Sequence, residues 1–384
     1  MKNYWKNIIE KLSRKIRNKI GLILYLKRNQ IEALNVSYNG QLLEEKWAFK
    51  EAKCYIENSE KIKEAELIDL SIIVPLYNSE KFIHECVRGF LNQRTQYKFE
   101  VILVNDGSID GTLSIIYDYQ KKYPQLFVVI DQPNKGISGA RNTGLQSAKG
   151  KYVAFADHDD RVAEEMVEKL LAAAYRENAD IVKAAYTNIM NGKTKNSEEE
   201  VDVIIDGIMK KELFNFRSYI FPGVFRRELF EHVNFPEGYW YEDMLVRILL
   251  YRQASKFVHI SDILYYKNFH TSNASFVVWS IKNYKCLEQL YLVMNLIEEN
   301  RKLELPEDVW FYQCIMRELS GMLAQRTRGI DEQTKQMVFL KACNILKELY
   351  RDEFKESLLE SNKIWQRAFE NKEYKLWLLL SGYY

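Results

Sequence analysis

The sequence predicts an α/β fold in which helices flank a mostly parallel, doubly wound sheet. Three observations support this prediction. Short runs of strand length alternate with helical stretches from residue 70 to about residue 188. The runs are almost continuously apolar, as in strands buried on both faces of a parallel sheet. Over 163–176, apolar residues recur at intervals of three and four, the spacing of a helix that packs on such a sheet. Ligands of these sheets bind beyond the carboxyl ends of the strands, so we expect functional residues there.

The predicted elements follow one another as strand, helix, strand. Besides 163–176, the pattern predicts a helix over 244–252 and helices throughout 281–384. Residues 190–240 are expected to hold loops and a return to the sheet edge. The five expected strands are 70–76, 100–105, 126–130, 152–157 and 180–186.

The two ends of the chain differ from the middle, which predicts an N-terminal helical segment (1–69), a sheet domain (70–280) and a C-terminal helical domain (281–384). Residues 1–30 carry nine Lys or Arg and one acid, and their apolar side chains fall on one helical stripe. Such a helix either lies on an anionic membrane surface or packs its stripe on the rest of the protein. The apolar tail 374–384 is expected to dock on a neighbouring helix, with lipid contact as the alternative. A homo-oligomer through the helical region stays open.

Composition excludes several classes of protein. Of 384 residues, 47% are hydrophobic and 28% are charged, as in globular chains. The 55 basic and 53 acidic side chains leave a net charge of +2, so no nucleic-acid partner is expected. Five cysteines lack C-x-x-C spacing, which favours reduced thiols over disulfides or a zinc site. No apolar run approaches the roughly 18 residues of a membrane span. We therefore expect a cytoplasmic protein, which is peripheral on the inner face of the membrane in the case that residues 1–30 lie on that surface.

Two motifs follow the first two predicted strands. VPLYN (74–78) ends a strand in a turn, at which Asn78 tolerates turn geometry and Tyr77 offers a ring for stacking on a planar ligand. VNDGSIDGT (104–112) forms a tight turn in which Asp106 can accept a hydrogen bond from the edge of a nucleobase. Each motif alone is equally consistent with an ordinary turn that ends a strand.

A third motif, NKGISGARNTG (134–144), combines glycines with a cation. The glycines permit close approach of the backbone, a helix N-terminus there favours phosphate, and Arg141 adds bidentate geometry. The glycine spacing does not match a G-x-G-x-x-G dinucleotide fingerprint.

The most informative run is YVAFADHDD (152–160). Side chains two apart in an extended chain share a face, so Asp157 and Asp159 converge while His158 faces the other way. At an effective dielectric of about 20, like charges about 4 Å apart repel by roughly 4 kcal/mol. A hard divalent cation held by the carboxylates removes this cost. The alternative is that the aspartates cap a helix that starts near Val162.

The fifth motif, FPEGYWYEDMLV (235–246), places Glu242 and Asp243 among aromatic residues. They are either acids at a helix N-terminus, where the helix dipole favours them, or a general base in an aromatic sugar-binding pocket.

In this order, the five motifs closely resemble the glycosyltransferase family 2 enzymes with the glycosyltransferase-A fold, over roughly residues 70–270. The resemblance implies transfer of a sugar from a nucleotide-diphosphate donor, usually a uridine one, with inversion and with bound Mg²⁺ or Mn²⁺. It implies that Asp243 is the catalytic base, supported by Glu242, and that Asp157 and Asp159 of the D-x-D element bind the metal. The implied nucleotide-sugar site comprises Pro75, Tyr77, Asn78, Asp106, Gly107, Ser108, Asn134, Gly136, Ala140, Arg141 and Asp157.

The chain departs from the family's pattern at two of these motifs. Asn105 occupies a position where the family often has an Asp, so the resemblance does not define the nucleoside specificity. His158 replaces the usual small residue in D-x-D. The segment 264–276 resembles the part that closes over the site, where His270 or Lys267 would touch the diphosphate.

The expected function is hexosyl transfer to a hydroxyl of a glycan or lipid-linked glycan, in surface polysaccharide or glycoconjugate synthesis. One rival is a membrane-associated scaffold that binds a nucleotide sugar without turnover. The other is a nucleotidyltransferase, which needs a Gly-rich basic loop after the first strand; VPLYNSEKF (74–82) is not one.

Overall fold

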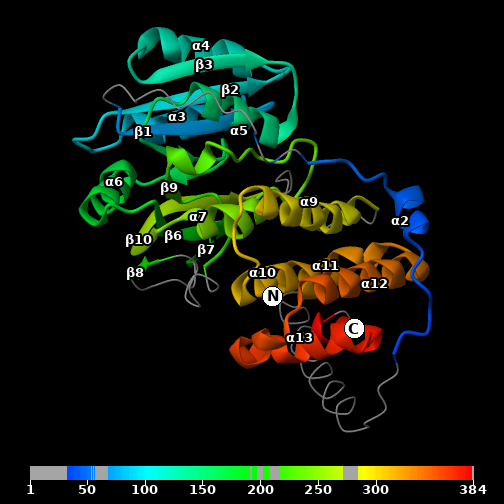
Figure 1. Ribbon diagram of the computed structural model, residues 1–384. Helices are drawn as coiled ribbons and strands as arrows, with labels where there is room; N and C mark the ends of the chain where they lie inside the picture. Colours follow the sequence, from blue (N-terminus) through cyan, green and yellow to red (C-terminus); the bar gives the residue numbers. More distant parts are fainter. Residues whose placement is uncertain are drawn as a thin grey trace. The chain divides into compact units, whose positions relative to one another are not determined.

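The computed structural model places the described residues in two compact units (Figure 1). One holds the sheet, from residue 52 to residue 270, together with 295–305; the other is helical. The helix predicted for residues 1–30 lies outside the described part of the chain, and the division at residues 69 and 280 stays a prediction. The structure describes residues 33–52, 54, 56, 68–190, 193–196, 202–207, 216–270 and 284–382.

The first half of the sheet is parallel, as predicted. β1 (Leu70–Leu76), β2 (Phe99–Asp106) and β3 (Phe127–Gln132) are neighbours in that order (Figure 1). β4 (Tyr152–Phe155) pairs with the other edge of β1. Every residue of β1 is buried, which explains its continuous apolar run because neither face meets water. The four strands point the same way, so their carboxyl ends lie along one edge of the sheet.

The second half of the sheet is mixed. β9 (Gly223–Arg226) is inserted antiparallel between β4 and β6 (Ile181–Met190). β10 (Lys256–Phe269) runs parallel to β6. The α/β fold class is therefore confirmed, with antiparallel strands added beyond the parallel core.

The region 190–240 only partly follows the prediction. Two short strands, β7 (Lys193–Asn196) and β8 (Val203–Asp206), return to the sheet and pair with β6 and β10. The expectation of an edge position is wrong for β9, which lies in the middle of the strand order. Gly223 suits this place because a Cβ there would lie 2.6 Å from the Val182 carbonyl oxygen.

The helices of the sheet unit agree with the periodicity. The predicted helix over 163–176 is present but begins three residues later, and 244–252 is helical as a π-helical segment (Val246–Leu250) followed by α7 (Tyr251–Gln253). The helices that alternate with the strands are α3 (Ile83–Leu91), α4 (Thr112–Lys122), α5 (Gly136–Ser147) and α6 (Met166–Glu177).

A short strand rules out the capping interpretation of the aspartates. β5 (Arg161–Val162) pairs antiparallel with β10 where that interpretation put the start of a helix. The next helix begins only at Met166, with Glu165 as its N-cap residue. The aspartates before β5 are therefore not helix caps.

The C-terminal region is helical, as predicted. The tail helix packs on its neighbours: Trp377 is fully buried and its Nε1 donates to the Leu319 carbonyl at 3.1 Å. In the described residues no helix is long and apolar enough to cross a bilayer, and all five cysteines are buried free thiols. The helices are α9 (Glu288–Lys302), α10 (Val309–Arg317), α11 (Leu323–Arg326), α12 (Glu332–Leu349), α13 (Glu360–Glu370) and α14 (Tyr374–Leu380), and α2 (Gly40–Lys46) belongs to the same unit as α10–α14.

Helix α5 lies unusually close to the parallel strands. A Cβ on Gly144 would come within 2.4 Å of Ile73 Cγ2 in β1, and Ala140 is fully buried. These small residues let the helix backbone approach the sheet, and this approach fixes the position of Arg141 at the carboxyl edge.

Replacing Gly144 by alanine should destabilise the protein by about 1–3 kcal/mol, because the added methyl group overpacks the contact between α5 and β1. Chemical denaturation measures this change. Gly321→Ala is the control: the added Cβ would meet its nearest neighbours at 3.7 Å, so near-neutral stability is expected. A Gly144→Ala variant as stable as wild type would contradict the close approach.

Candidate functional site

The loops after β1 and β2 are tied to each other. Asn78 adopts a left-handed conformation with φ of 50°. Its backbone N–H donates to Ser108 Oγ at 2.9 Å, and its Oδ1 accepts from the Ile109 N–H at 3.0 Å. Tyr77 beside it is 50% exposed, so its ring is available to a ligand. Pro75, in contrast, lies in the buried strand and can only shape the backbone there.

Asp106 organises the loop that leads into α5. Its Oδ1 accepts from Gln132 Nε2 at 2.7 Å and from the Lys135 N–H at 2.8 Å. Asn134 Nδ2 donates to the Asp106 carbonyl at 2.9 Å. Gly107 permits this contact, because with φ of 71° a Cβ would lie 2.8 Å from Asn134 N. The second and third motifs therefore form one structure.

The start of α5 is open. Gly136 has φ of 76°, and a Cβ there would meet no heavy atom within 4 Å. The structure thus brings the β1, β2 and β3 loops together with the N-terminus of α5, as the order of the motifs predicts.

The acidic motif is a turn, which corrects the prediction of an extended chain. β4 ends at Phe155, and the Asp160 N–H donates to the Asp157 carbonyl at 3.2 Å. One carboxylate oxygen each of Asp157, Asp159 and Asp160 lies within 4.8 Å of the others. Asp157 and Asp159 converge as expected, but the turn adds Asp160, which alternation along an extended strand could not place.

The end of β10 supplies partners to this acidic turn. The Tyr265 hydroxyl accepts from the Asp157 N–H at 3.0 Å, and the Asn268 N–H donates to Asp160 Oδ1 at 2.8 Å. His270 Nε2 lies 2.9 Å from Asp159 Oδ2. Sequence reasoning missed Tyr265, whose only signal was its place in the strand before Lys267 and His270.

Lys267 interacts electrostatically with acidic residues of both the acidic turn and the fifth motif. Its ammonium lies 4.4 Å from the centroid of the Phe221 ring. Burial lowers the pKa of Lys267, but the carboxylates of Asp157, Asp160 and Asp243 outweigh burial and raise it overall. The lysine is therefore a permanent cation within the acidic cluster.

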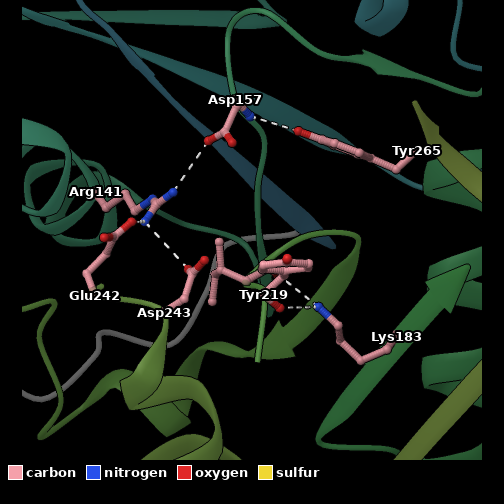
Figure 2. Close-up of polar contacts among 8 residues, drawn as sticks. Arg141, Asp157, Lys183, Tyr219, Glu242, Asp243 and Tyr265 are labelled. Atoms are coloured by element: carbon pink, nitrogen blue, oxygen red, sulfur yellow. Dashed lines mark hydrogen bonds and ion pairs between the residues drawn. The ribbon is translucent and has the colours of Figure 1, made fainter. Parts of the chain in front are cut away.

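Arg141 connects the acidic turn to the acid pair of the fifth motif (Figure 2). Its Nη1 lies 2.8 Å from Glu242 Oε1 and 3.9 Å from Asp243 Oδ1, and its Nη2 lies 3.4 Å from Asp157 Oδ1. The arginine side chain is only 3% exposed. The structure thus brings both predicted metal ligands and both predicted catalytic acids to one place.

Asp243 has the environment of a proton acceptor. Its side chain is 28% exposed, but its Oδ1 is buried without a hydrogen-bond partner. Burial, with the neighbouring Glu242 carboxylate, raises the pKa of Asp243 to about 7, against the opposing effect of Arg141. A carboxyl group with a pKa near neutrality is suited to general base catalysis.

Comparison with known proteins identifies the family. The family model described as Glycosyl transferase family 2 matches residues 71–233. Glycosyltransferase GlyG of Streptococcus pneumoniae is 32% identical over 212 residues, which cover 51% of this chain and 69% of GlyG. The chain belongs to glycosyltransferase family 2.

Two further similarities bear on length and fold. The uncharacterized glycosyltransferase EpsJ of Bacillus subtilis is 35% identical over 207 residues, 51% of this chain and 60% of EpsJ, so the chain spans less than two thirds of that relative. The first 349 residues of Staphylococcus aureus TarS, solved with UDP-GlcNAc, give a TM-score of 0.61 at 20% identity, over 82% of this chain and 90% of that chain. This likeness confirms the glycosyltransferase-A-like fold.

Asp160 gives the site a pH-dependent stability. Burial and the Asp157 and Asp159 carboxylates raise its pKa to about 8, although Lys267 opposes the shift. The ordinary carboxyl pKa is about 4. Between these values the folded protein holds a proton that the unfolded chain releases, so the free energy of unfolding falls as pH rises through this window.

Asp160→Asn removes this effect and should raise the melting temperature by a few degrees at about pH 8, and by less at about pH 5. Thermal unfolding in the presence of a chelator measures it. Asp206→Asn is the control, since that side chain is 72% exposed. A gain that is equal at both pH values would contradict the raised pKa.

Proposed function

We propose that the protein transfers a sugar from a nucleotide-diphosphate donor to a hydroxyl of an acceptor, with inversion at the anomeric carbon and with the help of Mg²⁺ or Mn²⁺. The observation that carries this proposal is the convergence of the acidic turn (Asp157–Asp160) with the acid pair Glu242–Asp243 around Arg141. The acidic turn would stabilise charge and the acid pair would accept a proton, and the Arg141 guanidinium contacts both.

The acidic turn fits a hard divalent cation. Carboxylate oxygens are the ligands such ions prefer, and three of them lie within 4.8 Å of one another. Asp157 and Asp159 would hold the ion, with Asp160 as a third ligand. The bound ion supplies Lewis-acid stabilisation of the charge that gathers on the leaving diphosphate.

The charge balance supports the same assignment. Two permanent cations among the described residues, Arg141 and Lys267, interact with the acidic groups, but the pKa values of Asp160 and Asp243 stay raised. An added divalent cation reduces the remaining repulsion, which is largest between the carboxylates of the turn.

The nucleoside would bind at the loops after β1 and β2. Tyr77 offers an exposed ring for stacking, and Asp106 with Ser108 lines the turn beside it. The open backbone around Gly136 at the start of α5 suits the phosphates. A uridine donor is supported by TarS, the structure of similar fold that was solved with UDP-GlcNAc.

Asp243 would act as the general base. It accepts the proton of the acceptor hydroxyl as that oxygen attacks the anomeric carbon from the face opposite the diphosphate. Glu242 would support Asp243 by raising its pKa, and both carboxyl groups lie near Arg141 Nη1. One displacement forms one bond and breaks one bond, so this chemistry needs no nucleophilic Ser or Cys.

The acceptor half of the proposal rests on the sequence and the relatives. We propose a glycan or lipid-linked glycan of a surface polysaccharide or glycoconjugate. Contact of residues 1–30 with an anionic membrane surface would bring the site close to such an acceptor.

Asp243→Asn should bind the donor normally while turnover falls by at least roughly a hundredfold, because the amide cannot accept the proton. Release of nucleoside diphosphate from a panel of nucleotide sugars with Mn²⁺ measures turnover, and calorimetry measures binding. Asp262→Asn, on the same sheet and paired with Lys169, should leave both unchanged. Wild-type turnover in Asp243→Asn would show that the base is misassigned; binding without turnover in the wild type would favour the scaffold.

Asp159→Ala should lower the affinity of the protein for Mn²⁺ by about tenfold or more, because it removes a carboxylate ligand of the turn. Titration of Mn²⁺, followed by calorimetry and by Mn²⁺-dependent release of nucleoside diphosphate, measures both effects. Asp206→Ala, an exposed acid on β8, should behave as wild type. Unchanged Mn²⁺ affinity in Asp159→Ala would remove this residue from the metal site.

A further inference from the structure

Two consecutive buried residues of α5 hold the segment that carries the acid pair. This segment, Phe235–Asp243, contains no helix or strand, and two of its residues, Gly238 and Tyr241, have positive φ of 77° and 70°. Its geometry therefore depends on contacts from elsewhere in the chain.

Asn142 fixes the beginning of the segment. Its Oδ1 accepts from the Phe235 N–H at 2.8 Å, and its Nδ2 donates to the Phe235 carbonyl at 3.0 Å. The same Nδ2 lies 3.2 Å from Glu237 Oε1. Because Asn142 is itself only 5% exposed, these bonds are shielded from water and hold the segment against α5.

Arg141 fixes the end of the segment. Nη1 points to Glu242 and Asp243, and Nη2 points to Asp157 in the acidic turn (Figure 2). The guanidinium carbon also lies 5.3 Å from the centroid of the Phe235 ring. A planar guanidinium holds its two Nη atoms in a fixed relation, so the group sets the spacing between Glu242 and Asp157.

We infer that Arg141 is a positioning residue rather than a ligand of the donor: it holds the acid pair and the acidic turn at the separation that the reaction needs. The inference rests on the proposed function, and it changes the role that the family resemblance implied for this residue. Since both Nη atoms of the arginine are already directed at three carboxylates of the protein, a donor would have to break these contacts to bind them.

Lysine can test this role because it keeps the charge but offers a single nitrogen. In Arg141→Lys we expect turnover at saturating donor to fall by about tenfold or more, since small misplacements of reacting groups are costly. The dissociation constant for UDP, measured by calorimetry, should stay within about threefold of wild type. Loss of UDP binding with turnover preserved at saturation would overturn the inference, and so would full turnover in the lysine variant.

A second readout does not depend on activity. Hydrogen exchange of the backbone amides in residues 235–243 should become faster in Arg141→Lys, because that segment loses one of its two anchors. Arg226→Met is the matched control: Arg226 is also a largely buried arginine, 2.8 Å from Asp180 Oδ1 on another part of the sheet. It should leave exchange in 235–243 and turnover unchanged. Unchanged exchange in Arg141→Lys would overturn the inference.

If Arg141→Lys does not fold, Glu242→Gln tests the same contact from its other end. It removes the charge of the 2.8 Å pair with little change of shape, and the same separation of turnover from UDP binding is expected. The proposed function would fail in a different way, because wild type would then show no turnover with any nucleotide sugar. Hydrogen exchange in Arg141→Lys would still test the positioning role, because that measurement does not depend on turnover.

Discussion

Five acidic side chains from two distant parts of the chain meet at the carboxyl edge of the parallel strands, and the repulsion between those that are ionised constrains the groups around them. At an effective dielectric of about 20, each pair of like charges about 4 Å apart costs roughly 4 kcal/mol. Among the described residues, Arg141 of α5 and Lys267 of β10 oppose this repulsion. A divalent ion held by the turn, as proposed, would oppose the repulsion further.

The placement of both cations depends on backbone features away from the acids. α5 approaches β1 closely because Gly144 has no side chain, and this brings Arg141 to the edge. β10 carries extra residues relative to β6 at two points between Ile260 and Tyr265. Such bulges re-aim the side chains that follow them. Beyond these points, Tyr265 and Lys267, two residues apart, both interact with the acidic turn.

The family match and the geometry support different parts of the site. The matched range, residues 71–233, includes the loops after β1 and β2 and the acidic turn but ends before Glu242 and Asp243. The candidate base is instead connected to the matched part by physical contacts, through Arg141 and through the hydrogen bonds of Asn142. This is why the further inference concerns α5: the helix is the structural link between the two halves of the proposed chemistry.

Local pattern was enough to place the parallel strands, the helical C-terminal region and the acidic motif, because apolar periodicity and residue type report burial and charge directly. It also singled out Asp157 and Asp159, whereas the role predicted for Glu242 and Asp243 came from the family resemblance. It did not bring Asp160 to the same place as Asp157 and Asp159, because a turn replaced the extended chain that alternation assumes. Nor could it place β9 inside the sheet, or show that Arg141 faces three carboxylates of its own chain. Those outcomes depend on which distant segments pack together, and long-range packing leaves no periodic trace in the sequence.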